Sequence, residues 1–334
     1  MNRLKIKTLV YVTIALGLFF LSFASGGLVW GTQKEVTYRP LSDWTENNPL
    51  KVSAVSGKIH INNNWTATKS AGICTGNGTY SNPYIIEDLV IDGGGSGSGI
   101  VIENSNVYFR IENCTLYYSR VAGINLQQVG NGTLVDNNCS LNSWLDSKGI
   151  YLSNSQNNTI SGNTANNNWY GIFLTGSDNN SISGNTANNN TYFGIHLSDS
   201  ENNTVSGNTA TYNQYGIALR FSEYNTVSGN TANSNTLSGI YLRESYNNIV
   251  SGNTANSNTL IGIYLRNSDN NNILGNILIG NDVCIKEIEC GDNNIFENND
   301  CGGENPAIPG YNLFFLIGIF SVVAILIHQK IKKP

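Results

Sequence analysis

Charged residues are scarce in this sequence. Asp, Glu, Lys and Arg make up 12% of its 334 residues, against about 25% in an average globular protein. The net charge is −5 and no basic stripe occurs, which excludes nucleic acid as a partner. The three histidines (His60, His196 and His328) lie far apart and methionine occurs once, so the clustered ligands of a copper site are missing. We therefore expect neither a bound metal nor a cofactor.

Two uncharged apolar runs lie near the ends of the chain. Residues 1–24 combine a basic start, an apolar run and small residues, the layout of a signal peptide, with an uncleaved anchor as the alternative. Residues 311–327 are apolar and long enough to cross a membrane. The basic tail 328–334 favours a cytoplasmic C-terminus. Residues 25–54 form a linker and the start of a cap, and 303–310 form a second linker. We predict a protein held at the cell surface by its C-terminus.

The middle of the chain repeats two short motifs. The glycine of "SGN", or of its variant "LGN", occurs at positions 162, 184, 207, 229, 252 and 275. The glycine of "GI-x-L" occurs at 171, 194, 216, 239 and 262. Both motifs recur every 22 or 23 residues. Such a period is typical of stacked units and not of a globular core.

Two solenoid classes have repeats this short, leucine-rich repeats and β-helices. The segments between the motifs are rich in Asn, Gly, Thr and Ile, which disfavour the helix of a leucine-rich repeat and favour extended chain. Within "GIYL", Ile240 and Leu242 point inward and Tyr241 points outward. The pattern predicts an all-β, right-handed, single-stranded parallel β-helix of about eight or nine coils over residues 55–302.

One asparagine recurs at an equivalent position in each repeat. Stacked Asn side chains hydrogen-bond along a column, and Asn tolerates the left-handed conformation that a corner needs. We predict a structural ladder here, with a polar binding groove as the alternative. The column contains Asn163, Asn185, Asn208, Asn230, Asn253 and Asn276.

A family resemblance rests on residues 72–105 ("GICTGNGTYSNPYIIEDLVIDGGGSGSGIVIENS") and on the "NNTISGNT" repeats that follow. They resemble the parallel β-helix repeat proteins of the NosD type, over most of residues 55–302. The resemblance implies the same fold. Because that family is named for a periplasmic copper-binding protein, it also implies copper handling, an alternative that the scattered histidines do not support.

The C-terminal tail carries a second resemblance. The motif "PGYNLF" (309–314), the apolar run and the short basic end resemble the C-terminal sorting signals of archaeal surface proteins. That resemblance implies removal of the tail and transfer of the protein to a lipid. Permanent anchoring through residues 311–327 is the alternative.

Six cysteines in a chain expected outside the cell predict disulfides. Cys114 ("ENCTL") and Cys139 ("NNCSL") lie in similar contexts one coil apart. Stacked strands lie about 4.8 Å apart, which suits the Cα spacing of a disulfide. We therefore predict that these two pair with each other. The unassigned cysteines are Cys74, Cys284, Cys290 and Cys301.

The outward positions of the "GI-x-L-x" motif place aromatic residues in one column and arginines in the next. Aromatic patches mark contact surfaces and provide stacking platforms for sugar rings. The alternative is cross-strand packing, which stabilises a sheet without a ligand. The candidate ligand-binding residues are Tyr151, Phe173, His196, Arg220, Tyr241, Arg243, Tyr264 and Arg266.

Acidic residues recur at the corner after this motif. The candidate catalytic residues are Asp178, Glu201 and Glu223, whose neighbours in the stack are expected near the roughly 5 Å separation of a retaining glycosidase pair. They recur from coil to coil, however, whereas an active site breaks a repeat. We predict a surface-anchored β-helix protein with a structural or adhesive role. Its expected partners are a polysaccharide or envelope glycan and a surface protein, and a polysaccharide lyase or glycoside hydrolase is the alternative.

Overall fold

The computed structural model describes residues 54–303. The predicted signal segment 1–24, nearly all of the linker 25–54 and everything from residue 304 on, including the predicted anchor 311–327, lie outside the described residues. Within the described part of the chain, no helix is long and apolar enough to cross a membrane.

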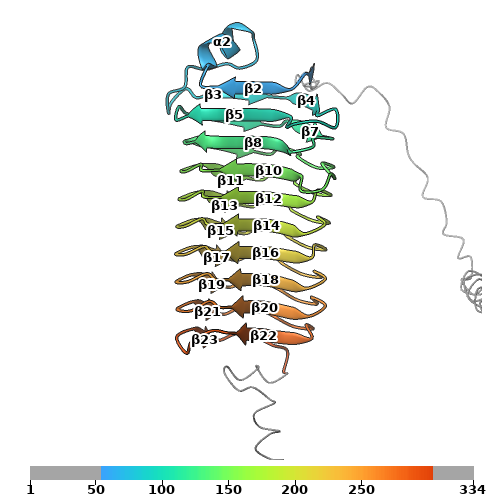
Figure 1. Ribbon diagram of the computed structural model, residues 1–334, viewed down its shortest axis with the longest axis vertical. Coiled ribbons are helices and arrows are strands. Elements are labelled where there is room, and N and C mark those ends of the chain that lie inside the picture. Colours follow the sequence, from blue (N-terminus) through green and yellow to red (C-terminus); the bar gives the residue numbers. More distant parts are fainter. Residues whose placement is uncertain (1–53, 304–334) are drawn as a thin grey trace, which may run out of the picture. The chain divides into compact units, whose positions relative to one another are not determined.

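Residues 54–303 form a parallel β-solenoid (Figure 1). Sheet I has ten strands: β2 (Ile59–Asn62), β5 (Ile100–Ser105), β8 (Ala122–Val129), β10 (Lys148–Ser153), β12 (Tyr170–Thr175), β14 (Phe193–Ser198), β16 (Tyr215–Arg220), β18 (Ser238–Arg243), β20 (Ile261–Arg266) and β22 (Val283–Ile288). Sheet II also has ten: β3 (Tyr84–Glu87), β6 (Phe109–Glu112), β9 (Gly132–Val135), β11 (Thr159–Ser161), β13 (Ser181–Ser183), β15 (Thr204–Ser206), β17 (Thr226–Ser228), β19 (Ile249–Ser251), β21 (Asn272–Leu274) and β23 (Ile295–Glu297).

A third side closes each coil. Sheet III contains β1 (Ala54–Ser56), β4 (Leu89–Asp92) and β7 (Thr115–Tyr117). In the later coils, this third side consists of isolated parallel β-bridges, one per coil, from Thr115 to Asp300. The predicted all-β parallel solenoid is therefore confirmed.

The core is a stack of inward aliphatic side chains. In the coil that begins with β16, Ile217, Leu219, Val227 and Ala232 are all 0% exposed, and the next coil superposes on it in register. Burying each of the three larger side chains contributes roughly 1.5–3 kcal/mol. That is too little to fix one coil against its backbone entropy, so the coils stabilise one another.

The glycine of "GI-x-L" is required by close packing between coils. A Cβ on Gly216 would lie 2.6 Å from the carbonyl oxygen of Gly239 and 2.9 Å from that of Ala210. Since both are backbone atoms, relief requires the coils to move apart. We expect Gly216→Ala to lower the free energy of unfolding by about 3 kcal/mol in a denaturant titration. Gly57→Ala, where nothing lies within 4 Å, is the matched control, and an equal loss in both variants would contradict this packing.

The predicted asparagine column lies at the corner between sheets II and III. In Asn208, Oδ1 accepts hydrogen bonds from the backbone N and Nδ2 of Asn185, each at 2.9 Å. Its Nδ2 donates to the carbonyl oxygen of Ile182 at 2.8 Å and to Oδ1 of Asn230 at 3.0 Å. The same pattern links all six asparagines of the column and extends to Asn137 and Asn299.

Asparagines also occupy the other two corners. One further ladder contains Asn158, Asn180, Asn203, Asn225, Asn248, Asn271 and Asn294. Another contains Asn142, Asn168, Asn190, Asn213, Asn235, Asn258 and Asn281. Neither ladder was predicted from the sequence, although their asparagines recur with the same period. Every corner thus satisfies its buried backbone groups with side-chain amides.

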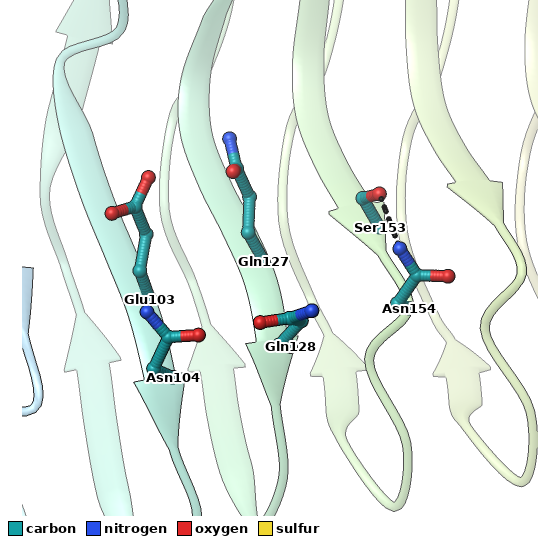
Figure 2. Close-up of a pocket in the computed structure, with 6 residues that line it drawn as sticks. All are labelled: Glu103, Asn104, Gln127, Gln128, Ser153 and Asn154. Atoms are coloured by element: carbon teal, nitrogen blue, oxygen red, sulfur yellow. Dashed lines mark hydrogen bonds between the residues drawn. The ribbon is translucent and has the colours of Figure 1, made fainter.

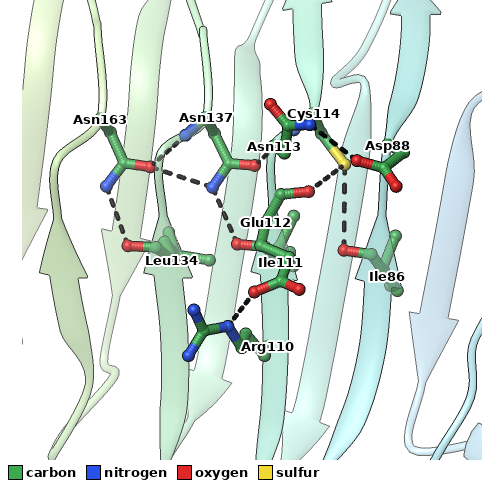
Figure 3. Close-up of polar contacts among 10 residues, drawn as sticks. All are labelled: Ile86, Asp88, Arg110, Ile111, Glu112, Asn113, Cys114, Leu134, Asn137 and Asn163. Carbon is green, nitrogen blue, oxygen red and sulfur yellow. Dashed lines mark hydrogen bonds and ion pairs between the residues drawn. The ribbon is translucent and has the colours of Figure 1, made fainter. Parts of the chain in front are cut away.

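The prediction of a Cys114–Cys139 disulfide is wrong. Both thiols are free and buried. The reason is the register: Thr115 bridges Asn138, so Cys114 lies opposite Asn137, and its backbone N–H donates to Asn137 Oδ1 at 3.0 Å. Figure 3 shows the Cys114 sulfur directed instead toward the carbonyl oxygens of Ile86 and Glu112. Cys114 therefore occupies the first position of the asparagine ladder.

The two ends of the described solenoid differ. At the N-terminal end, the short helix α2 (Trp65–Ser70) lies beside β2 at the end of the stack (Figure 1). The ring of Trp65 stacks on that of Tyr84, with 4.9 Å between their centroids. Its indole N–H donates to Ser105 Oγ at 2.7 Å. At the C-terminal end, a disulfide joins Cys284 to Cys301, whose Cα atoms are 5.7 Å apart. The latter bond ties β22 to the end of the last coil.

Cysteine chemistry tests this arrangement. Peptide mapping without reduction is expected to find Cys284 linked to Cys301, with Cys114 and Cys139 unlinked. Burial raises the pKa of the Cys114 thiol to about 11 and raises that of Cys139 further. Both should therefore resist alkylation at pH 8 until the protein is unfolded. A peptide that links Cys114 to Cys139 would contradict the register described above.

Candidate functional site

The outward surface of sheet I, here called the ring face, contains the predicted ligand-binding residues. Its strands place three columns of side chains in register. Column 1 contains Lys148, Tyr170, Phe193, Tyr215, Ser238 and Ile261. Column 2 contains Tyr151, Phe173, His196, Ala218, Tyr241 and Tyr264. Column 3 contains Ser153, Thr175, Ser198, Arg220, Arg243 and Arg266.

Aromatic rings stack continuously from β10 to β20. The path starts in column 2, crosses to column 1 at β14 and returns to column 2 at β18. Its successive centroid distances are 5.5 Å for Tyr151–Phe173, 4.7 Å for Phe173–His196, 4.2 Å for His196–Phe193, 5.2 Å for Phe193–Tyr215, 5.0 Å for Tyr215–Tyr241 and 5.1 Å for Tyr241–Tyr264. Apart from the shorter His196–Phe193 contact, these separations lie in the range of favourable aromatic pairs, about 4.5–7 Å.

The crossing is made necessary by Ala218. A methyl group leaves column 2 without a ring at β16, and Tyr215 of column 1 supplies the contact to Tyr241 instead. Ala218 itself is completely covered. Burial raises the pKa of the Tyr215 hydroxyl to about 12, so the hydroxyl keeps its proton at physiological pH.

Column 2 is more buried than an outward position implies. His196 is 4% exposed and Tyr241 is 8% exposed, whereas Tyr151, Phe173 and Tyr264 remain partly exposed. The rings of the two columns cover one another and form an apolar layer outside the sheet. Cross-strand packing and an accessible aromatic surface therefore coexist on this face.

His196 lies beneath this layer without a polar partner. Neither Nδ1 nor Nε2 has a hydrogen-bond partner, and the ring lies flat against Phe173, with an interplanar angle of 6°. Burial, followed by the positive charge of Arg220, lowers the pKa of His196 to about 3. The imidazole is therefore neutral in the folded protein at physiological pH.

The arginine column borders the rings on the C-terminal half of the face. Arg220, Arg243 and Arg266 are in register on β16, β18 and β20. The side chain of Arg243 pairs with Glu244 at 3.2 Å, and that of Arg266 pairs with Glu289 at 3.4 Å. Both pairs are partly exposed, so they neutralise Arg243 and Arg266 with a small contribution to stability.

Lys148 occupies the other end of the ring stack. Its ammonium group lies 5.2 Å from the centroid of the Tyr151 ring, 5.6 Å from that of Tyr170 and 5.8 Å from that of Phe173. It also pairs with Asp146 at 2.9 Å. Lys148 was not predicted from the sequence, although it directly precedes a "GI-x-L" glycine, the position that carries Tyr170 in the next coil.

A family model described as "Right handed beta helix region" matches residues 52–218 and 149–301. Together the two matches span most of the chain. This chain belongs to the right-handed β-helix family. The finer resemblance to the NosD type stays a prediction. Among curated proteins, no sequence is significantly similar.

Solved structures of similar β-helices are distant in sequence. A point mutant of the periplasmic alginate epimerase AlgG is 19% identical over 63% of this chain and 62% of that chain, with a TM-score of 0.46. The Dettilon tailspike protein (gp208) is 17% identical over 65% and 53%, with a TM-score of 0.49. The A-module of the Azotobacter vinelandii mannuronan C-5 epimerase AlgE6 is 14% identical over 66% and 89%, with a TM-score of 0.36. The β-helix described here thus spans 62% of the first of these chains, and the likeness concerns the fold alone.

The predicted acidic residues lie in one corner column of this β-helix. Asp178 Oδ1 accepts a hydrogen bond from the backbone N–H of Glu201 at 2.7 Å, so this carboxylate supports the turn of the next coil. The backbone carbonyl of Glu223 accepts a hydrogen bond from the N–H of Asn202. The structure thus brings the three acids into successive turns and gives Asp178 a structural contact.

Polar residues surround an open hollow on the N-terminal half of the ring face (Figure 2). It has a volume of about 240 Å³ and lies where β5, β8 and β10 end. The lining residues are Glu103, Asn104, Gln127, Gln128, Ser153 and Asn154. The carboxylate of Glu103 also contacts His60 at 2.9 Å. The hollow continues column 3 and presents amides and a hydroxyl where the other half presents arginines.

The side chains of this β-helix that could ligate a metal ion do not cluster within the described residues. Among residues 54–303, no group of three or more His, Cys, Asp and Glu side chains is placed to hold a metal ion. His60 lies on β2 and His196 lies on β14, under the rings.

Proposed function

We propose that this right-handed β-helix is a cell-surface protein whose ring face binds glycan chains. The surface location is supported by the signal-like layout of residues 1–24 and by the apolar run 311–327 before a basic tail. Both segments lie outside the described residues. The binding role is supported by the composition and geometry of the ring face.

One observation carries the binding proposal: an unbroken ring stack borders a column of in-register arginines on a single sheet. Sugar rings present apolar faces that stack on aromatic rings, and guanidinium groups donate hydrogen bonds to ring and substituent oxygens. Tyr264 and Arg243 are partly exposed and Arg266 is exposed, so these groups are accessible to a ligand. Strand pairing holds the groups in place before binding, which reduces the entropic cost of association.

Retention on immobilised polysaccharides tests the proposal. The full-length chain is passed over acidic and neutral polymers, and the chain length of each polymer is measured before and after. We expect retention without shortening. The variant Tyr241→Ala/Arg243→Ala/Tyr264→Ala should lower the affinity about tenfold or more, because it removes two stacking rings and a donor.

The matched control lies on the outward surface of sheet II. Thr204→Ala/Thr226→Ala/Ser228→Ala removes three outward side chains from the two coils that precede β18 and is expected to retain the polymers like the unmodified protein. Equal losses in both triple variants would contradict binding by the ring face. Shortening of a polymer that is abolished by Asp178→Asn, Glu201→Gln or Glu223→Gln would instead identify a carbohydrate-active enzyme.

A further inference from the structure

Unpaired polar atoms concentrate at one point of the ring face. Six buried side-chain nitrogen and oxygen atoms lack a hydrogen-bond partner among residues 54–303. Three of the six belong to two neighbouring residues: Nδ1 and Nε2 of His196, and Nε of Arg220. Because buried donors and acceptors are costly when unsatisfied, such a concentration calls for an explanation.

The positive charges of column 3 are not all balanced by carboxylates, and the imbalance lies at Arg220. The position after each arginine of the column holds Phe221, Glu244 and Asn267 in turn, and the following coil adds Glu289. Glu244 pairs with Arg243, and Glu289 pairs with Arg266.

Arg220 has no such carboxylate. Phe221 replaces the acid that follows Arg243, and Asp199 of the preceding coil accepts a hydrogen bond from Ser198 Oγ at 2.8 Å. In the described part of the chain, no acidic side chain forms an ion pair with Arg220. The column therefore carries one guanidinium in excess of its carboxylates.

The Arg220 charge also reaches across the ring layer. Burial is the main cause of the pKa shifts of Tyr170, His196, Tyr215 and Tyr241, and the Arg220 charge contributes by lowering each of these pKa values. The Nε atom of Arg220 is itself buried, and Arg220 lies two residues after Ala218, the register partner of His196 on the neighbouring strand. A ligand that stacks on these rings would place its substituents beside a cation without a counter-ion.

We propose that Arg220 is the position of the ring face that selects anionic sugars, those with a carboxylate or a sulfate group. The inference rests on the proposed function of that face and specifies its ligand. Arg220 supplies planar donors to the anion, and the rings on either side supply the stacking surface for the sugar. Arg243 and Arg266 are paired with Glu244 and Glu289. They therefore help to position the glycan chain but discriminate less between charged and neutral sugars.

Paired polymers test the selection. Polygalacturonate is compared with its fully methyl-esterified form, and dextran sulfate with dextran, on the full-length protein. We expect Arg220→Gln to weaken binding of either charged polymer at least about tenfold, and to change binding of the neutral partners by less than about twofold. Arg243→Gln, whose charge is already paired, is the matched control and should weaken charged polymers by less than about threefold. Equal losses for the two variants, or an equal loss for neutral polymers, would overturn the proposal.

Small anions separate this inference from the proposed function. The Nε–Hε resonances of the arginines are followed while glucuronate or inorganic sulfate is titrated into the unmodified protein. A saturable shift of the Arg220 resonance, larger than that of Arg243, is the expected result even if no polymer is retained, and in that case only glycan-chain binding would fail. The absence of such a shift with both anions would overturn the anion site. A response to only one anion would identify the group that is recognised.

Discussion

The substitution Asn208→Ala is expected to lower the free energy of unfolding by about 4 kcal/mol. Asn208 is 1% exposed and its side chain makes four hydrogen bonds to the adjacent coils. Alanine leaves the amide groups of Asn185 and the carbonyl oxygen of Ile182 buried without these partners. Denaturant titration measures the loss, and hydrogen exchange should show reduced protection of the Asn185 amide.

Thr204→Ala is the matched control in the same coil. Thr204 is exposed on the outward surface of sheet II, and we expect its loss to cost less than about 1 kcal/mol. If Asn208→Ala were as mild as Thr204→Ala, the asparagine ladder would be dispensable. Strand pairing and the aliphatic core would then hold the coils together without it.

Stability is expected to fall with acid through His196. Its pKa is about 3 in the folded protein, whereas the ordinary pKa of histidine, which applies in the unfolded chain, is 6.5. Below pH 6.5 the unfolded chain takes up a proton that the folded protein excludes, so protonation favours unfolding. The contribution of this group is fully present above pH 6.5 and decreases by about 1.4 kcal/mol per pH unit down to pH 3.

Denaturant titrations of the unmodified protein and of His196→Phe at pH 7, 6, 5 and 4 measure this effect. The difference in unfolding free energy between the two should change by roughly 2 kcal/mol from pH 7 to pH 5, in the direction that favours the variant in acid. His196→Gln provides the control, because it packs differently and does not titrate either. Both variants should show the same change with pH whatever their stability at pH 7, and a constant difference over the range would contradict a buried neutral imidazole.

The fold could be predicted closely from the sequence because each coil repeats the same pattern of inward, outward and corner residues. The alternation in "GI-x-L" places Ile217 and Leu219 inward, the period sets the coil length, and both are visible without a structure. Asparagine at a corner has a chemical signature as well, since its amide both donates and accepts along the column.

The details that the sequence did not reveal depend on register and on contacts between coils. Two cysteines in similar contexts were expected to meet, but coils of unequal length place Cys114 beside Asn137 and leave Cys139 as a separate core residue. His196 occupies an outward position and was expected to be exposed. Its burial results from Phe173 and Phe193, which belong to two different columns and cover it together.

Chemical modification of arginine tests most directly whether the ring face is the binding surface. The side chains of Arg243, Arg266 and Arg110 are exposed to similar extents, 37%, 45% and 42%, and Arg110 lies on sheet II. Phenylglyoxal labelling of the full-length protein is quantified by mass spectrometry with and without polygalacturonate. We predict that the polymer protects Arg243 and Arg266 and leaves the labelling of Arg110 unchanged. Equal labelling of all three with and without polymer, or protection of Arg110 alone, would contradict a glycan-binding ring face.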